Sequence, residues 1–197
     1  MDYFNKGESS GQSAFRAIRD WLFYPIVRPL ASLGVTPTMI SLLGGLFAAI
    51  AVAIPGQHWP WVAAGFGLYI LMDGLDGPLA RITNAESQGG SLVDIIMDQF
   101  GVFLVTIGAI HWLGANPALN ILFAFFYAHT IYLMVVCNLL KLQLPLIVRV
   151  KYFYFAIYIA SLYLHQSLFL DVFSAIFLVY YIGYFLFLFR TIFRHLK

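Results

Sequence analysis

Residues 73–98 have the sequence DGLDGPLARITNAESQGGSLVDIIMD, a polar stretch within a mostly apolar chain. If its flanks are helices, two aspartates lie three residues apart on one face, and two lie four apart on a face of the next helix. Four carboxylates between two helices repel one another unless cations neutralise them. The stretch therefore predicts a site for divalent metal ions with oxygen ligands, magnesium or manganese. The aspartates are Asp73, Asp76, Asp94 and Asp98.

The composition excludes a soluble domain. The 197 residues are 61% hydrophobic and 10% charged, and a soluble domain of this size could not bury so much apolar surface. We therefore expect an integral membrane protein, with membrane lipids around it and no nucleic acid as a partner. Within a membrane, four aspartates are also compatible with a proton relay or a polar contact between helices, because ionisable residues there are usually functional.

Six apolar segments each have close to the ~20 residues that a membrane-spanning helix needs. They predict an all-α membrane protein with six transmembrane helices in one domain, residues 37–197. Residues 1–36 are expected to form a cytoplasmic leader and an interfacial helix. The expected spans are 38–55, 59–83, 90–112, 117–140, 150–166 and 170–190.

Residues 14–24 predict the N-terminal interfacial amphipathic helix. This helix is too short to span a membrane and combines aromatic with basic residues, so it should lie in the interface. Pro25 and Pro29 are expected to break or kink the chain after it. The alternative is that these residues simply begin a long first helix. The apolar side would contain Phe15, Ile18, Trp21 and Leu22, and the polar side Arg16, Arg19 and Asp20.

The eleven lysine and arginine residues predict the orientation of the spans. All fall before span 1, between spans 2 and 3, between spans 4 and 5, or after span 6, within the uncertainty of the span ends. This asymmetry places both termini and the metal site on the cytoplasmic side. Trp59, Trp61 and Trp112 would then belong to an aromatic belt at the outer interface.

Metal ions held by the aspartates would bind and orient the oxygens of a phosphoryl group. Arg81, close to Asp76 along the helix, would meet a phosphate; alternatively it is a cytoplasmic anchor that touches only lipid. A carboxylate less committed to metal could act as a base for an attacking hydroxyl. Metal-assisted phosphoryl transfer at the cytoplasmic interface is therefore a candidate chemistry.

The same stretch fits the pattern Asp-x2-Asp-Gly-x2-Ala-Arg-x8-Gly-x3-Asp-x3-Asp at all eight fixed positions. In this it resembles the CDP-alcohol phosphatidyltransferase family, over about residues 37–98. The resemblance implies an enzyme of phospholipid biosynthesis that uses two Mg²⁺ or Mn²⁺ ions. An alcohol would attack a CDP-lipid, the phosphatidyl (or related lipid-phosphate) group would be transferred, and CMP would leave. A homodimer is implied as well.

The resemblance also implies roles for single residues. Asp73, Asp76 and Asp94 would hold the metals, while Asp98 would deprotonate the acceptor and could touch the second metal. Family members often begin span 1 with Pro-Asn-x-x-Ser/Thr, and here the sequence is Pro37-Thr38-Met-Ile-Ser41. The Thr38 hydroxyl can still form a hydrogen bond. The nucleotide would be contacted or given room by Thr38, Gly77, Ala80, Arg81 and Ser87.

The acceptor stays open. Lys141, Arg149 and Lys151 could bind an acceptor phosphate or merely follow the positive-inside rule. Gln99 stands where relatives that use glycerol phosphate or form cardiolipin commonly have lysine, which counts mildly against them. The nearest rival function is a CDP-aminoalcohol phosphotransferase with diacylglycerol as acceptor. An ion or proton transporter ranks lower, because the outer halves of the spans have almost no acidic or polar residues.

Overall fold

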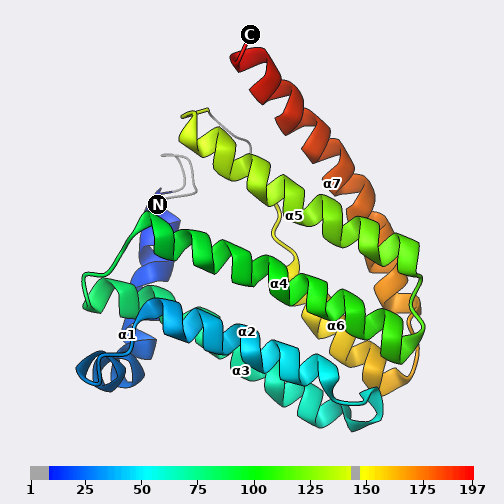
Figure 1. Ribbon diagram of the computed structural model, residues 1–197, viewed down its shortest axis with the longest axis horizontal. Coiled ribbons are helices and arrows are strands. Elements are labelled where there is room, and N and C mark those ends of the chain that lie inside the picture. The colour runs from blue at the N-terminus through cyan, green and yellow to red at the C-terminus, as the bar shows by residue number, and fades with distance from the viewer. Residues whose placement is uncertain (1–8, 143–146) are drawn as a thin grey trace. The chain divides into compact units, whose positions relative to one another are not determined.

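The computed structural model describes residues 9–142 and 147–197, with side chains described from residue 17 onward. All regular elements in these ranges are helices (Figure 1), which confirms the predicted all-α class. The elements are α1 (Ser9–Ser32), α2 (Pro37–Ala53), the short 3-10 helix η2 (Gly56–His58), α3 (Trp59–Ile82), α4 (Gln88–Leu113), α5 (Pro117–Leu139), α6 (Lys151–Leu164) and α7 (Leu168–His195).

Helices α2 to α7 begin and end within a few residues of the six predicted spans. Within the described residues, α4, α5 and α7 are long and apolar enough to cross a membrane, and α2 joined to residues 17–32 would make a fourth candidate. With 17 and 14 residues, α2 and α6 are shorter than the ~20 residues of a typical span. The protein is thus an integral membrane protein with three or four candidate spans, and the number six stays a prediction.

The N-terminal helix is longer than predicted. Its expected end before Pro25 is wrong, because α1 continues through Pro25 and Pro29 to Ser32. Each proline removes one backbone hydrogen bond, but the segment between them is packed. Val27 is fully buried in a cluster with Ile40 of α2 and with Leu75 and Leu79 of α3. Burial of this apolar surface stabilises the helix where its local sequence disfavours it.

A tight turn separates α1 from α2. Gly34 has a φ of +74°, a left-handed conformation that glycine adopts without strain. Thr36 then caps α2, since its side-chain oxygen accepts a hydrogen bond of 3.3 Å from the Met39 backbone N–H. As a result, residues 17–32 and α2 form an angle of 109°.

The described chain divides into two compact units. The first contains α1, α2, nearly all of α3 and the first half of α4, up to residue 101. Figure 1 shows α2 and α3 side by side, and Gly65 explains their closeness: a Cβ at this position would lie only 2.7 Å from the Ala51 Cβ. Small residues at such positions allow helix backbones to approach.

The second unit contains residues 55–59 and everything from residue 102 onward. A buried polar network around Asn120 of α5 holds its helices together. The Asn120 amide donates to Asp171 of α7 at 2.7 Å, and its oxygen accepts from Ser174 at 2.7 Å and from Tyr154 of α6 at 3.3 Å. Satisfied polar networks of this kind fix the mutual positions of apolar helices.

Candidate metal centre

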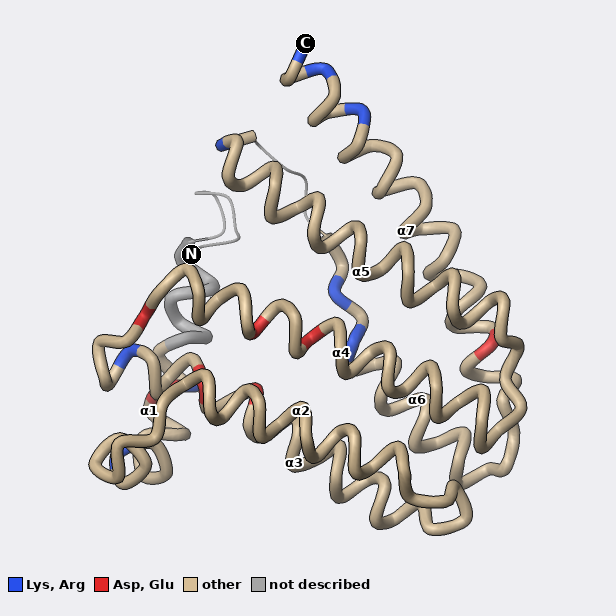
Figure 2. The backbone as a smooth tube through the Cα atoms, in the orientation of Figure 1, with Lys and Arg blue, Asp and Glu red and all other residues tan. Residues whose placement is uncertain are grey.

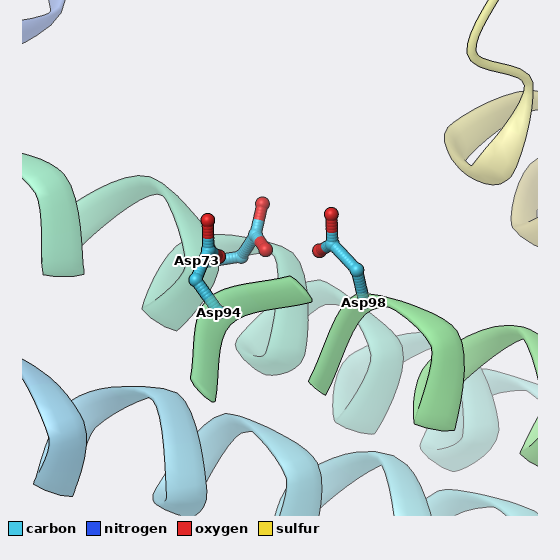
Figure 3. A group of neighbouring side chains, drawn as sticks. All are labelled: Asp73, Asp94 and Asp98. Atoms are coloured by element: carbon cyan, nitrogen blue, oxygen red, sulfur yellow. The ribbon is translucent and has the colours of Figure 1, made fainter. Parts of the chain in front are cut away.

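Three of the four predicted aspartates come together in the first unit. Asp73 of α3 and Asp94 and Asp98 of α4 each offer a carboxylate oxygen, and these oxygens lie within 4.8 Å of one another. All three residues are half-buried. Figure 3 shows their carboxylates turned to the same side of the two helices. Figure 2 shows the α4 pair as two acidic bands one turn apart on an otherwise uncharged helix.

This arrangement fits a divalent ion. Two oxygens bound to one magnesium ion at about 2 Å lie no more than about 4 Å apart. Small rotations of the three carboxylates would therefore let them share one ion. Carboxylate oxygens are the ligands that magnesium and manganese prefer.

The register between α3 and α4 is set beside the cluster. The hydroxyl of Tyr69, one turn before Asp73, donates a hydrogen bond of 3.1 Å to the Met97 carbonyl, which precedes Asp98. Tyr69 is buried, and its ring lies against Gly101, where a Cβ would come within 2.7 Å of the Tyr69 hydroxyl oxygen. Close packing and one hydrogen bond thus bring the aspartates of the two helices to the same level.

Asp76 lies outside this group of three. Its Oδ2 accepts a hydrogen bond of 2.8 Å from the hydroxyl of Ser41 on α2. Ser41 is buried and belongs to the Pro37–Ser41 motif. The bond therefore links the two predicted motifs directly, a contact that the sequence did not predict.

Arg81 has a partner that sequence reasoning missed. Its Nε donates a hydrogen bond of 2.8 Å to Oδ2 of Asp20 on α1, and its Nη2 pairs with Oδ1 of the same carboxylate. Trp21 and Tyr24 of α1 line a cavity of about 230 Å³ beside this ion pair. The sequence did place Asp20 on the polar side of the predicted N-terminal helix, and this acidic residue was the one feature that could have indicated a partner for Arg81.

The small residues of α3 also face α1. A Cβ on Gly74 would lie 3.1 Å from the Phe23 ring, and a Cβ on Gly77 would lie 2.6 Å from Nη2 of Arg19. Gly77 was expected to leave room for a nucleotide. In the structure the Arg19 guanidinium lies against Gly77, and the role of Gly77 at the nucleotide stays a prediction.

The remaining predicted contacts lie on several elements. Thr38 is exposed on α2, and Ala80 is half-buried on α3. Ser87 precedes α4, and its Oγ accepts a hydrogen bond of 3.0 Å from the Gly90 backbone N–H, as a helix cap does. Of the basic residues suggested for an acceptor phosphate, all three belong to the second unit: Lys141, Arg149 and Lys151.

Curated relatives of the chain are similar over part of their length. Phosphatidylinositol phosphate synthase of Cutibacterium acnes is 35% identical over 92 residues, which are 44% of this chain and 43% of that protein. Inner membrane protein YnjF of Escherichia coli is 37% identical over 92 residues, or 45% and 43%. The matched region thus spans less than half the length of these relatives.

Solved structures share the fold. A crystal structure of Mycobacterium tuberculosis phosphatidylinositol phosphate synthase (PgsA1) with manganese and citrate has a TM-score of 0.71 and 17% identity, and covers 86% of this chain and 88% of that one. The same enzyme with CDP-DAG bound has a TM-score of 0.68 and 17% identity, with 85% and 91% covered. At this identity the likeness concerns the fold alone.

A family model describes most of the chain. The model of CDP-alcohol phosphatidyltransferase matches residues 34–189, which include α2 to α6 and most of α7. This range contains both predicted motifs and the three gathered carboxylates. By that match the protein belongs to the CDP-alcohol phosphatidyltransferase family.

Proposed function

We propose that the protein transfers a phosphatidyl (or related lipid-phosphate) group from a CDP-lipid to the hydroxyl of an alcohol acceptor, releasing CMP. The observation that carries the proposal is the gathering of Asp73, Asp94 and Asp98 from the family motif within 4.8 Å. The family membership supports it, as does the CDP-DAG bound to the enzyme of similar fold.

The aspartates have distinct roles in this proposal. Asp73, Asp76 and Asp94 would hold two divalent ions, Mg²⁺ or Mn²⁺, and Asp98 would also touch the second ion; the ions would neutralise the phosphate oxygens and the charge that develops on them. Asp98 takes the proton from the acceptor hydroxyl. The acceptor oxygen then forms the new bond to phosphorus as the bond to the CMP oxygen breaks. Ser41 keeps the Asp76 carboxylate in one orientation through its hydrogen bond.

The nucleotide contacts follow the motif. Thr38 and Ser87 supply hydroxyls, Arg81 meets the phosphates or the ribose, and Gly77 and Ala80 leave space. The Asp20 ion pair supports this role of Arg81, because it holds the planar guanidinium in one position.

We also propose the topology of six spans with both termini and the site on the cytoplasmic side. The angle of 109° between residues 17–32 and α2 supports an interfacial α1, since an interfacial helix lies across a spanning one. The division into residues 1–36 and 37–197, and a homodimer, remain predictions.

The acceptor is a matter for experiment. Three similar proteins are named phosphatidylinositol phosphate synthase, which favours an inositol phosphate, whereas the name of YnjF indicates no acceptor. We would measure CMP release from CDP-diacylglycerol by the full chain in detergent with magnesium. The acceptor panel is inositol phosphate, glycerol phosphate, inositol, serine and phosphatidylglycerol.

The outcomes separate the candidates. CMP release that depends on one acceptor supports the proposal and identifies the product. Release only from CDP-choline or CDP-ethanolamine with diacylglycerol assigns the chain to the aminoalcohol branch. No release from either donor, together with no binding of magnesium, would contradict the proposal.

A further inference from the structure

Arg19 of α1 is placed unusually for an arginine on an interfacial helix. Its guanidinium lies against the backbone of α3 at Gly77, where a Cβ would meet Nη2 at 2.6 Å. Its Nε–H is buried and has no hydrogen-bond acceptor among the described residues. A buried donor without an acceptor is unfavourable, so this geometry indicates an acceptor that arrives with a ligand.

A second guanidinium lies at the same position. Nη1 of Arg81 is 3.4 Å from the point where a Gly77 Cβ would be. Asp20 meets the charge of Arg81 through both of its oxygens. Asp76, the residue before Gly77, is directed to Ser41 of α2. The corner formed by Arg19, Asp20 and Arg81 thus carries two positive charges against one negative charge.

This corner has a fixed relation to the carboxylate cluster. Gly77 follows Asp73 by four residues on α3, so the two lie on one face, about 5–6 Å apart at the level of side chains. A diphosphate has its two phosphate groups a few ångströms apart. One phosphate at the carboxylate cluster would leave the other within reach of the two guanidinium groups.

We propose that Arg19 binds a phosphate of the CDP-lipid donor, beside Arg81 and over Gly77, and so makes α1 part of the donor site. This inference rests on the proposed function. Arginine suits the task because its planar fork of N–H donors pairs with two phosphate oxygens at once. The phosphate supplies the missing acceptor for Nε and balances the charge of the corner. A head-group phosphate of a bilayer lipid has the same chemistry, and the test separates the two sources.

The experiment measures the dissociation constant of CDP-diacylglycerol for the full chain in phosphatidylcholine nanodiscs with magnesium. The variants are Arg19→Gln and Arg19→Lys. The matched control is Arg28→Gln, because Arg28 is an exposed arginine on the same helix. We expect Arg19→Gln to bind about tenfold or more weakly, the size of effect of a hydrogen bond to a charged group. The affinity of Arg19→Lys for CDP-diacylglycerol should fall between those of Arg19→Gln and the wild type. The affinity of Arg28→Gln should match that of the wild type.

Steady-state kinetics with the preferred acceptor gives a second readout. Arg19→Gln should raise KM for the CDP-lipid and leave KM for the acceptor unchanged, which a merely structural role would not do. Elution profiles and melting temperatures show whether each variant is folded. If Arg19→Gln fails to fold, Arg19→Lys is compared with Arg28→Gln instead. Weaker CDP-lipid binding by Arg19→Lys supports the inference, and equal binding overturns it.

Unchanged CDP-lipid affinity in folded Arg19→Gln would overturn the inference and leave the proposed function intact. A second comparison adds phosphatidylglycerol to the nanodiscs and measures the rise in melting temperature. If Arg19→Gln loses this rise but keeps its CDP-lipid affinity, Arg19 binds the phosphate of a bilayer lipid, and the inference is again overturned while the proposed function stands. Wild-type protein that binds no CDP-diacylglycerol would overturn the proposed function and this inference together.

Discussion

Two acidic sites in this protein differ in the number of carboxylates that they bring together. In the second unit, Asp171 at the start of α7 is surrounded by donors: the Asn116 backbone N–H at 3.0 Å, the Asn120 amide at 2.7 Å and the Ser167 hydroxyl at 3.0 Å. In the first unit, the carboxylate oxygens of Asp73, Asp94 and Asp98 gather within 4.8 Å of one another.

The difference indicates what each site is for. A carboxylate whose oxygens accept several hydrogen bonds is stabilised by the protein itself, and Asp171 also benefits from the helix dipole in the first turn of α7. Carboxylates that gather around one point create a negative potential suited to a cation. Under the proposed function the three-aspartate cluster carries the chemistry, whereas Asp171 stabilises the second unit, and substitutions can separate the two roles.

The largest expected effect is that of Asp98→Asn. The amide cannot take the acceptor's proton, so turnover should fall by about 10²–10⁴-fold, the usual contribution of a general base. Binding of the CDP-lipid should largely remain. CMP release and a binding assay on the same sample test this, and wild-type turnover would refute Asp98 as the base.

Asp76→Asn and Ser41→Ala test how the fourth aspartate takes part. Asp76→Asn removes a proposed ligand, and Ser41→Ala removes only the group that orients it. Because partners of metal ligands typically affect metal affinity by about 10–100-fold, Ser41→Ala should raise the magnesium concentration for half-maximal turnover about tenfold. Asp76→Asn should raise it further. A magnesium titration of turnover measures both effects. Curves that match the wild type would mean that Asp76 is not a metal ligand.

Asn120→Ala should lower the stability of the protein without changing the magnesium dependence of turnover. Asn120 is fully buried, and its loss leaves Asp171, Ser174 and Tyr154 short of partners. The free energy of unfolding should fall by about 1–3 kcal/mol, while the magnesium dependence of the remaining activity is unchanged. Denaturant titration in detergent measures the first quantity. An altered magnesium dependence would contradict the separation of the two sites.

The smallest expected effect on stability is that of Asp20→Asn. The side chains of Arg81 and Asp20 are 28% and 38% exposed, so solvent screens their ion pair. Its loss should change the free energy of unfolding by less than about 1 kcal/mol. A larger loss in the same titration would mean that this pair resembles Asp171, a structural contact.

Sequence patterns predicted the helices well, because an apolar run of spanning length has few alternatives in a membrane. They failed at the end of α1, which was expected before Pro25, because packing of Val27 against α2 and α3 maintains the helix through Pro25 and Pro29. Local sequence does not contain that information.

The candidate site divides in the same way. The gathering of Asp73, Asp94 and Asp98 followed from helical spacing within one short stretch. The contacts of Asp76 and Arg81 could not be predicted, since their partners lie 35 and 61 residues away in the sequence. Only the packing of α2 and α1 against α3 brings those partners close.

The cavity beside the Arg81–Asp20 pair has a practical consequence for spectroscopy. Trp21 lines it and is 78% exposed. The other three tryptophans are Trp59 and Trp61 in the first turn of α3 and Trp112 in the last turn of α4. With those three replaced by phenylalanine, the fluorescence of Trp21 and its quenching by brominated lipids would test the proposed position of α1 at the membrane interface. Under the proposal that α1 is part of the donor site, changes in that emission on titration with CDP-lipid would report donor binding without an added label.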